Sequence, residues 1–109
     1  MQKGGFPMIE QVFKLADTDE RAVEKIIADE NIHYNHMVLQ KGEGLPVHLS
    51  NSNVYMTVLR GTLSIALGGQ PAAAYPRLTL LKIPKGVRMD IKNLHDETLE
   101  FTVVKAPAP

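Results

Sequence analysis

The sequence predicts an all-β protein, an antiparallel sandwich or barrel with one short N-terminal helix, and three observations support that prediction. About seven or eight short stretches alternate apolar and polar residues, which is the period of a half-buried strand. Glycine and proline separate these stretches, as at Gly68-Gly69 and Pro84-Lys85-Gly86. Only one stretch has a helical period, whereas a parallel sheet needs a crossover helix between successive strands.

Composition narrows the class of protein further. The chain has 109 residues, 44% of them apolar, and therefore fits one domain with one modest core. Its 12 basic and 12 acidic side chains cancel, which argues against binding to nucleic acid or to an anionic membrane. The absence of cysteine excludes disulfides and a thiolate nucleophile, and it fits a reducing compartment. No apolar run approaches the roughly 20 residues of a membrane span, so we expect a cytoplasmic protein.

Residues 1–30 are expected to form an N-terminal unit that packs on the barrel. Met1–Pro7 contains two glycines and is expected to be a flexible arm. Met8–Leu15 is expected to be a short strand that can pair with the edge of its own sheet or a neighbour's. A helix is expected over Asp17–Glu30, because Asp17 and Glu20 have the spacing of a capping box. The apolar stripe of this helix consists of Ala22, Val23, Ile26 and Ile27.

Residues 31–105 are expected to form the β-barrel, and residues 106–109 a flexible tail. In the first strand His36 shares a face with Tyr34 and Val38, and both faces mix polar with apolar residues. Such a mixture suits a strand inside a two-sheet structure. The expected strands cover residues 32–39, 54–59, 63–67, 78–83, 87–92 and 99–103, with a loop at 70–76.

Two motifs resemble those of the cupin family. Gly42, His48 and Gly61 have the spacing of the first cupin motif, in which a glycine precedes a His-x-His pair, a glutamate and a second glycine. Ser50 stands in place of the second histidine, and Val54 in place of the glutamate.

The second motif follows in the expected order. Pro84, Gly86 and Asn93 match it, whereas Leu78 replaces its glycine and Met89 its histidine. The resemblance covers roughly residues 32–104, which is most of the chain, and it implies a double-stranded β-helix, or jelly-roll barrel, with its site inside the mouth. It also implies a homodimer, in which the strand at 8–15 can cross to the partner sheet.

The family's metal centre needs three histidines and a glutamate around one ion. Of the matching positions only His48 offers a good ligand, since Val54 cannot bind a metal and Met89 suits only soft metals. We therefore expect no metal. The alternative is a divalent transition metal at His48, in a site rebuilt with His36, as in an oxygenase or isomerase.

The replacements at the ligand positions make the barrel mouth apolar, which is typical of sites for small, partly apolar molecules. The expected ligand-binding residues are His48, Ser50, Val54, Met56, Met89 and His36. Two other interpretations stay open. These side chains can simply fill a dry core, or the protein can be an interaction domain with a filled barrel and an exposed apolar patch elsewhere.

Overall fold

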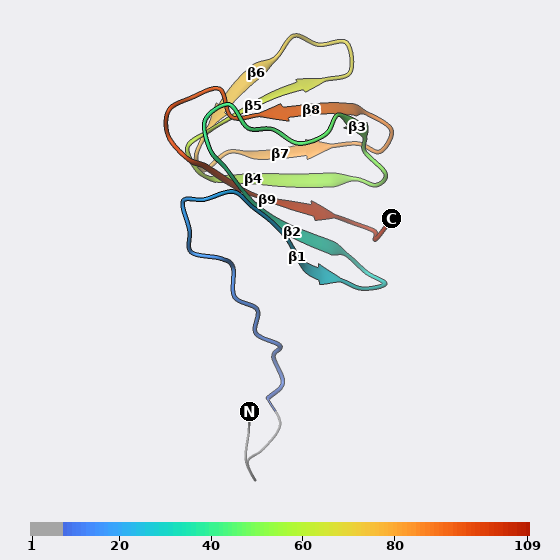
Figure 1. Cartoon of the computed structure of the whole chain (residues 1–109). Helices are drawn as coiled ribbons and strands as arrows, with labels where there is room; N and C mark the ends of the chain where they lie inside the picture. The colour runs from blue at the N-terminus through green and yellow to red at the C-terminus, as the bar shows by residue number, and fades with distance from the viewer. Residues whose placement is uncertain (1–7) are drawn as a thin grey trace.

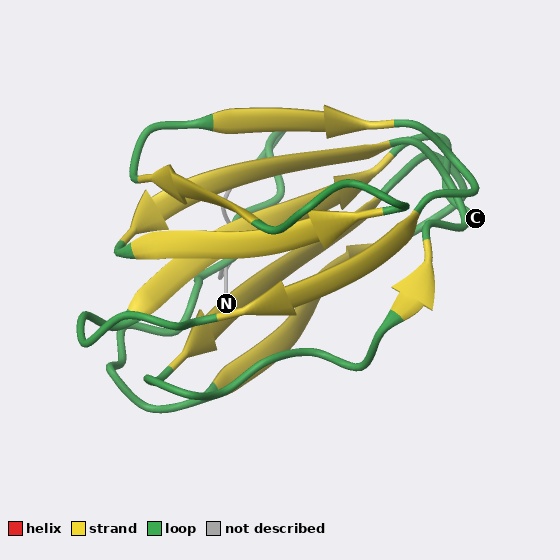
Figure 2. Cartoon of the chain, turned by 90° about the horizontal axis from the view of Figure 1, so that it is seen from above, coloured by secondary structure: helices red, strands yellow, loops and turns green. Residues whose placement is uncertain are grey.

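The computed structural model describes residues 8–109, which form two antiparallel β-sheets packed face to face (Figures 1 and 2). The large sheet has the strand order β1-β2-β9-β4-β7, and the small sheet the order β3-β8-β5-β6. The all-β class is confirmed. The arm predicted at Met1–Pro7 lies outside the described residues. The strands are β1 (Ala22–Ala28), β2 (His33–Leu39), β3 (His48–Leu49), β4 (Val54–Arg60), β5 (Thr62–Leu67), β6 (Ala73–Pro76), β7 (Leu80–Ile83), β8 (Arg88–Lys92) and β9 (Leu99–Lys105).

The core lies between the sheets and follows the period of two. On β9, for example, Leu99, Phe101 and Val103 are buried in the core, and the residues between them face the opposite side of the sheet. The face of the large sheet that lines the core is called the inner face below, and the opposite face the outer face. The core consists of Met37, Leu39, Val54, Met56, Val58, Leu63, Ile65, Ile83, Met89, Ile91, Leu99, Phe101 and Val103.

Gly61 connects the two sheets in the tight turn between β4 and β5. Its φ is +77°, and a Cβ there would lie 2.4 Å from the carbonyl oxygen of Thr98. Both the backbone conformation and the space therefore require glycine at this position.

The helix predicted over residues 17–30 is wrong, because Ala22–Ala28 forms the edge strand β1. β1 pairs with β2, and its register shifts between Lys25 and Ile27. A β-bulge of this kind breaks the alternation of faces, and Ile26 and Ile27 line the same hollow. The two adjacent isoleucines imitate a helical stripe in the sequence, but strand pairing outweighs helix propensity here.

Two further expectations were wrong. Residues 8–15 are not assigned to any strand, and residues 73–76, predicted as loop, form β6 at the edge of the small sheet. Alanine and proline are poor strand formers, so only the pairing of β6 with β5 reveals it. The tail at 106–109 is bonded to the body, since the Ala108 N–H donates to the carbonyl of Asn31.

Candidate functional site

The cupin-like motifs meet at one end of the sandwich, where His48 on β3 is paired with Met89 on β8. Paired residues point to the same side of a sheet, yet their environments differ. Met89 is buried in the core, whereas His48 is exposed and its Nδ1 lies 2.8 Å from the carbonyl oxygen of Pro46. The expectation of a histidine deep inside the barrel is therefore wrong.

Ser50 holds the turn that closes this end of the sandwich. Its hydroxyl donates to the carbonyl of Pro84 at 2.7 Å and accepts the Val87 N–H at 2.9 Å. The side chain is buried, and both interactions are with backbone groups. The hydroxyl thus secures the residue 84–87 turn and is not directed to a cavity.

Val54, Met56 and Met89 all belong to the apolar core. None of the four hollows found along residues 8–109 is lined by these three residues. The positions that the sequence assigned to a ligand are filled by side chains packed on one another, as in an ordinary protein interior.

The residues at this end do not fit the metal that the cupin motif implies. His48 is the one imidazole among the matching positions and is turned to the surface. Ser50 is engaged with the backbone, and Val54 has no donor atom. Within residues 8–109, no three His, Cys, Asp or Glu side chains are placed to hold a metal ion.

The remaining motif residues hydrogen-bond the backbone or set its conformation. Asn93 is fully buried, and its side-chain amide donates to the carbonyls of Leu39 and Glu97 at 3.0 and 2.9 Å. Leu78, which replaces a motif glycine, has a φ of +69° and so keeps the left-handed conformation that glycine favours. The frame of the motif is present, and its ligands are not.

His36, the second expected ligand, lies on the outer face of the large sheet. Its ring is 0% exposed, with Nδ1 2.7 Å from Glu24 Oε1 and Nε2 2.6 Å from Glu100 Oε2. Glu24 is on β1 and Glu100 on β9, the two strands that flank β2. The structure therefore separates His36 from His48 by the core, and the site rebuilt from both histidines is wrong.

The buried ring belongs to a larger ionic cluster. The guanidinium of Arg60 on β4 lies 3.3 Å from Glu100 Oε1, measured at Nε, and it also pairs with Asp19. Glu24 accepts the Ala16 N–H at 2.9 Å, and this bond, followed by the bond from His36, lowers the pKa of Glu24 below its ordinary value of 4.5. The sequence shows no motif for this cluster, because the register of β1 on β2 and of β2 on β9 decides which residues meet.

Comparison with known proteins gives the family. An uncharacterized protein of Methanocaldococcus jannaschii is 38% identical over 103 residues, covering 94% of this chain and 89% of that protein. A crystal structure from the same organism, described as an RmlC-like cupin family protein with a double-stranded β-helix fold, superposes with a TM-score of 0.91 over 94% of this chain and 95% of the other, at 38% identity. The chain belongs to the RmlC-like cupin family. The cupin resemblance and the double-stranded β-helix are confirmed.

More distant cupins share the fold alone. A cupin superfamily protein of Desulfitobacterium hafniense has a TM-score of 0.72 at 10% identity, covering 92% of this chain and 93% of that one. No family profile matches the sequence. Among the described residues of this cupin, no helix is long and apolar enough to span a membrane.

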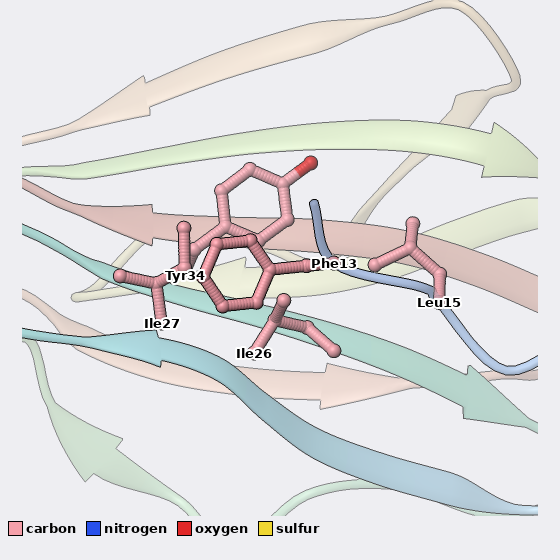
Figure 3. Close-up of a pocket in the computed structure, with 5 residues that line it drawn as sticks. All are labelled: Phe13, Leu15, Ile26, Ile27 and Tyr34. Carbon is pink, nitrogen blue, oxygen red and sulfur yellow. The ribbon is translucent and has the colours of Figure 1, made fainter. Parts of the chain in front are cut away.

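The outer face also carries an apolar hollow of about 290 Å³, shown in Figure 3. Phe13 and Leu15 lie on one side of it, and Ile26 and Ile27 of β1 together with Tyr34 of β2 on the other. The N-terminal chain therefore contacts the cupin on the face opposite to the core.

Residues 8–15, called the apolar segment below, run away from the sheets toward Met8 (Figure 1). The Ile9 side chain is 99% exposed, and Val12 is also exposed. Within the described part of the chain, the backbone of this segment makes no hydrogen bond to other backbone groups. Among residues 8–109, a largely apolar segment without backbone partners thus leads into a sheet whose edge strand β1 pairs only with β2.

Proposed function

We propose that this cupin is a homodimeric binding module that works without a metal centre, and that two copies associate through the apolar segment. The observation that carries the proposal is the exposure of this segment, together with an edge strand β1 that pairs only with β2 among residues 8–109. The filled core and the exposed apolar residues at 8–15 are what an interaction domain predicts.

The apolar side chains of the segment support this proposal. Five of the eight residues of the segment are apolar and substantially exposed, namely Met8, Ile9, Val12, Phe13 and Leu15. Contiguous exposed apolar surface on a small protein typically marks an interaction site. Burying such side chains stabilises a complex by roughly 25 cal/mol per Å² of apolar area removed from water.

The backbone gives a second argument. Within residues 8–109, the N–H and C=O groups of the segment have no backbone partner, and β1 pairs along one side only. Adding a strand to an exposed edge satisfies both sets at once. A second copy of the chain supplies both a segment and a β1 edge. If two copies are related by a two-fold axis, the segment of each copy can pair with the β1 edge of the other.

The mass of the full-length protein in solution tests the proposal. We expect light scattering after size exclusion to give twice the chain mass of 12.1 kDa. The double variant Ile9→Glu, Val12→Glu places charges on two exposed positions of the segment and should give the mass of one chain. Neither residue contributes to the core, so the variant should fold.

Leu94→Glu is the matched control, because Leu94 is exposed but lies on the loop between β8 and β9. It should remain a dimer. A monomeric wild-type protein, or a dimer that survives the double variant, would contradict the proposal.

A second candidate function keeps the small ligand at the motif end of the barrel. It is favoured by a hollow of about 350 Å³ where β5 and β7 end, the size of a site for a small molecule. Leu67 and Val87 give it an apolar wall against the core, and Lys82 and Gln70 supply polar groups. His48 and Ser50 lie outside this hollow, so the ligand contacts expected from the motif stay a prediction.

The dye 1-anilinonaphthalene-8-sulfonate tests this candidate because it pairs an apolar body with an anion. We expect saturable fluorescence enhancement that weakens in Lys82→Gln and is unchanged in Lys14→Gln, a lysine on the apolar segment. Equal binding by both variants would exclude the hollow as the dye's site.

A further inference from the structure

The ring of His36 requires two protons in the contacts that surround it. Each ring nitrogen lies within hydrogen-bonding distance of a different carboxylate oxygen, at 2.7 and 2.6 Å. An ionised carboxylate only accepts hydrogen bonds, whereas a neutral imidazole has one donor and one acceptor nitrogen. Both contacts are therefore satisfied by the imidazolium ion, whose charge is buried with two opposite charges beside it.

This cluster also holds the chain that leads to the apolar segment. Residues 16–19, called the root segment below, connect residues 8–15 to β1. Glu24 bonds both His36 and the Ala16 N–H through the same oxygen, Oε1. Arg60 bonds the Thr18 carbonyl at 2.8 Å and pairs with Asp19, while its Nε faces Glu100.

We propose that the imidazolium of His36 is the centre of a latch that fastens the root segment to the outer face, so that the charge of this ring controls how the apolar segment is presented. The ring holds Glu24 and Glu100 in place, and these carboxylates hold Ala16 directly and Arg60 through its guanidinium. This inference rests on the proposed dimer only for its consequence, which is a pH-dependent affinity between two copies.

The charged groups around the ring come from each element packed on it. β1 contributes Glu24, β9 contributes Glu100, β4 contributes Arg60, and the root segment contributes Asp19. Two cations face three anions, so loss of the His36 charge raises the excess of negative charge from one to two. Repulsion between them then opens the cluster.

The latch depends on charge on both sides of the ring. A neutral ring has only one N–H, so without the charge one of its two carboxylate bonds is lost and the latch weakens. Glu24 has a lowered pKa in the folded protein, so its contribution is present above the ordinary carboxylate pKa and is lost as the pH falls through the lowered value. The root segment should therefore lose order as the pH falls through the lowered pKa of Glu24.

Two measurements on the full-length protein test the latch. Nitrogen NMR of the histidine rings should show both nitrogens of His36 protonated at neutral pH. Amide exchange of Ala16, whose N–H is bonded to Glu24, should be slow in the wild type and on the order of tenfold faster in His36→Gln. His48→Gln is the matched control, since it replaces an exposed histidine that contacts none of these groups.

Glu24→Gln is the second variant in case His36→Gln does not fold, because Glu24 is partly exposed. It keeps an oxygen that can accept the Ala16 N–H but removes the charge, so the protection of Ala16, its exchange rate relative to that of an unstructured amide at the same pH, should fall below that of the wild type. A neutral His36 ring at neutral pH, or Ala16 exchange unaffected by either variant, would overturn the latch.

The same exchange measurement in the Ile9→Glu, Val12→Glu background separates this inference from the proposed function. Strong protection of Ala16 in a monomeric protein supports the latch whether or not two copies associate. Loss of that protection in this background, with His36 intact, overturns the latch even if the wild type is a dimer.

Discussion

The two faces of the large sheet differ in what their side chains do. The inner face presents Met37 and Phe101 to a closed apolar core, and no charged residue belongs to that core. The outer face, one residue away along the same strands, presents His36 and Glu100 to a buried ionic cluster. Neighbouring residues of β2 and β9 therefore serve a core and a polar surface at once.

This difference shows how a cupin can keep its frame without its metal chemistry. On the inner side Asn93 and Gly61 keep the turns, while Val54 and Met89 fill the space in which ligands would converge. Ionisable side chains that contact one another lie on the outer face instead, namely His36, Glu24, Glu100 and Arg60. Perturbed and buried ionisable groups are typical of functional sites, although structural ion networks contain them too. The following predictions test whether the inner face is structural and the outer face carries the function.

The largest effect is expected for Phe101→Ala, because Phe101 is the largest of the fully buried side chains. Removing its ring should lower the free energy of unfolding by about 3–5 kcal/mol, through lost burial and the cavity left behind. Denaturant unfolding followed by circular dichroism measures this. Association at a temperature where the variant is folded should be unchanged, and a specific loss of association would place the inner face in the function.

Ser50→Ala is the next largest. The change leaves the Val87 N–H and the Pro84 carbonyl without a side-chain partner, and it should cost about 1–3 kcal/mol. His48→Ala should cost no more than about 0.5 kcal/mol, since that ring is exposed. Equal effects of the two changes in thermal unfolding would show that His48 has a role that its surroundings do not reveal.

The inner face could be predicted from the sequence to a large extent. Alternation along residues 54–59 and 99–103 identifies β4 and β9, and the positions of Gly61 and Asn93 identify the cupin frame. The location of His48 could not be predicted, because alternation gives the side to which a residue points but not whether the end of the barrel is open. Packing around Met89 decides that question.

The outer face was largely beyond prediction. The bulge in β1 made Ile26 and Ile27 resemble a helix, which hid the strand that carries Glu24. Contacts between His36, Glu24 and Glu100 depend on the pairing of three strands, two of which lie far apart in sequence. No spacing rule within one segment contains that information.

A smaller effect is expected at the hairpin that joins β1 to β2 and so supports the outer face. Asp29 Oδ1 accepts the N–H groups of Asn31 and Ile32 at 2.8 and 2.9 Å. The bonds from Ile32 and then Asn31 lower the pKa of Asp29 below its ordinary value of 3.8. Its contribution is present above that value and is lost as the pH falls through the lowered pKa.

Asp29→Ala should therefore lower the melting temperature at neutral pH, and the difference from wild type should shrink under strongly acid conditions. Asp29→Asn keeps an accepting oxygen and should behave more like wild type at neutral pH. Thermal unfolding as a function of pH gives both comparisons. A wild-type advantage over Asp29→Ala that grows on acidification would contradict the assigned hydrogen bonds.

The smallest effect is expected at Leu78, where a leucine adopts the left-handed backbone conformation that the motif glycine favours. A leucine with a φ of +69° costs about 1–2 kcal/mol relative to a right-handed conformation, and this side chain is 74% exposed, so little packing offsets that cost. Leu78→Gly removes the strain but gives the unfolded chain about 0.5–1 kcal/mol more freedom. The net change should lie between zero and about 1 kcal/mol of stabilisation.

Leu80→Gly is the matched control, because Leu80 is 64% exposed but lies in strand β7, where glycine should destabilise the fold by about 0.5–1 kcal/mol. If Leu78→Gly instead lowers stability as much as Leu80→Gly does, the exposed leucine makes a stabilising contact. Its side chain, and not only its backbone conformation, would then support the fold.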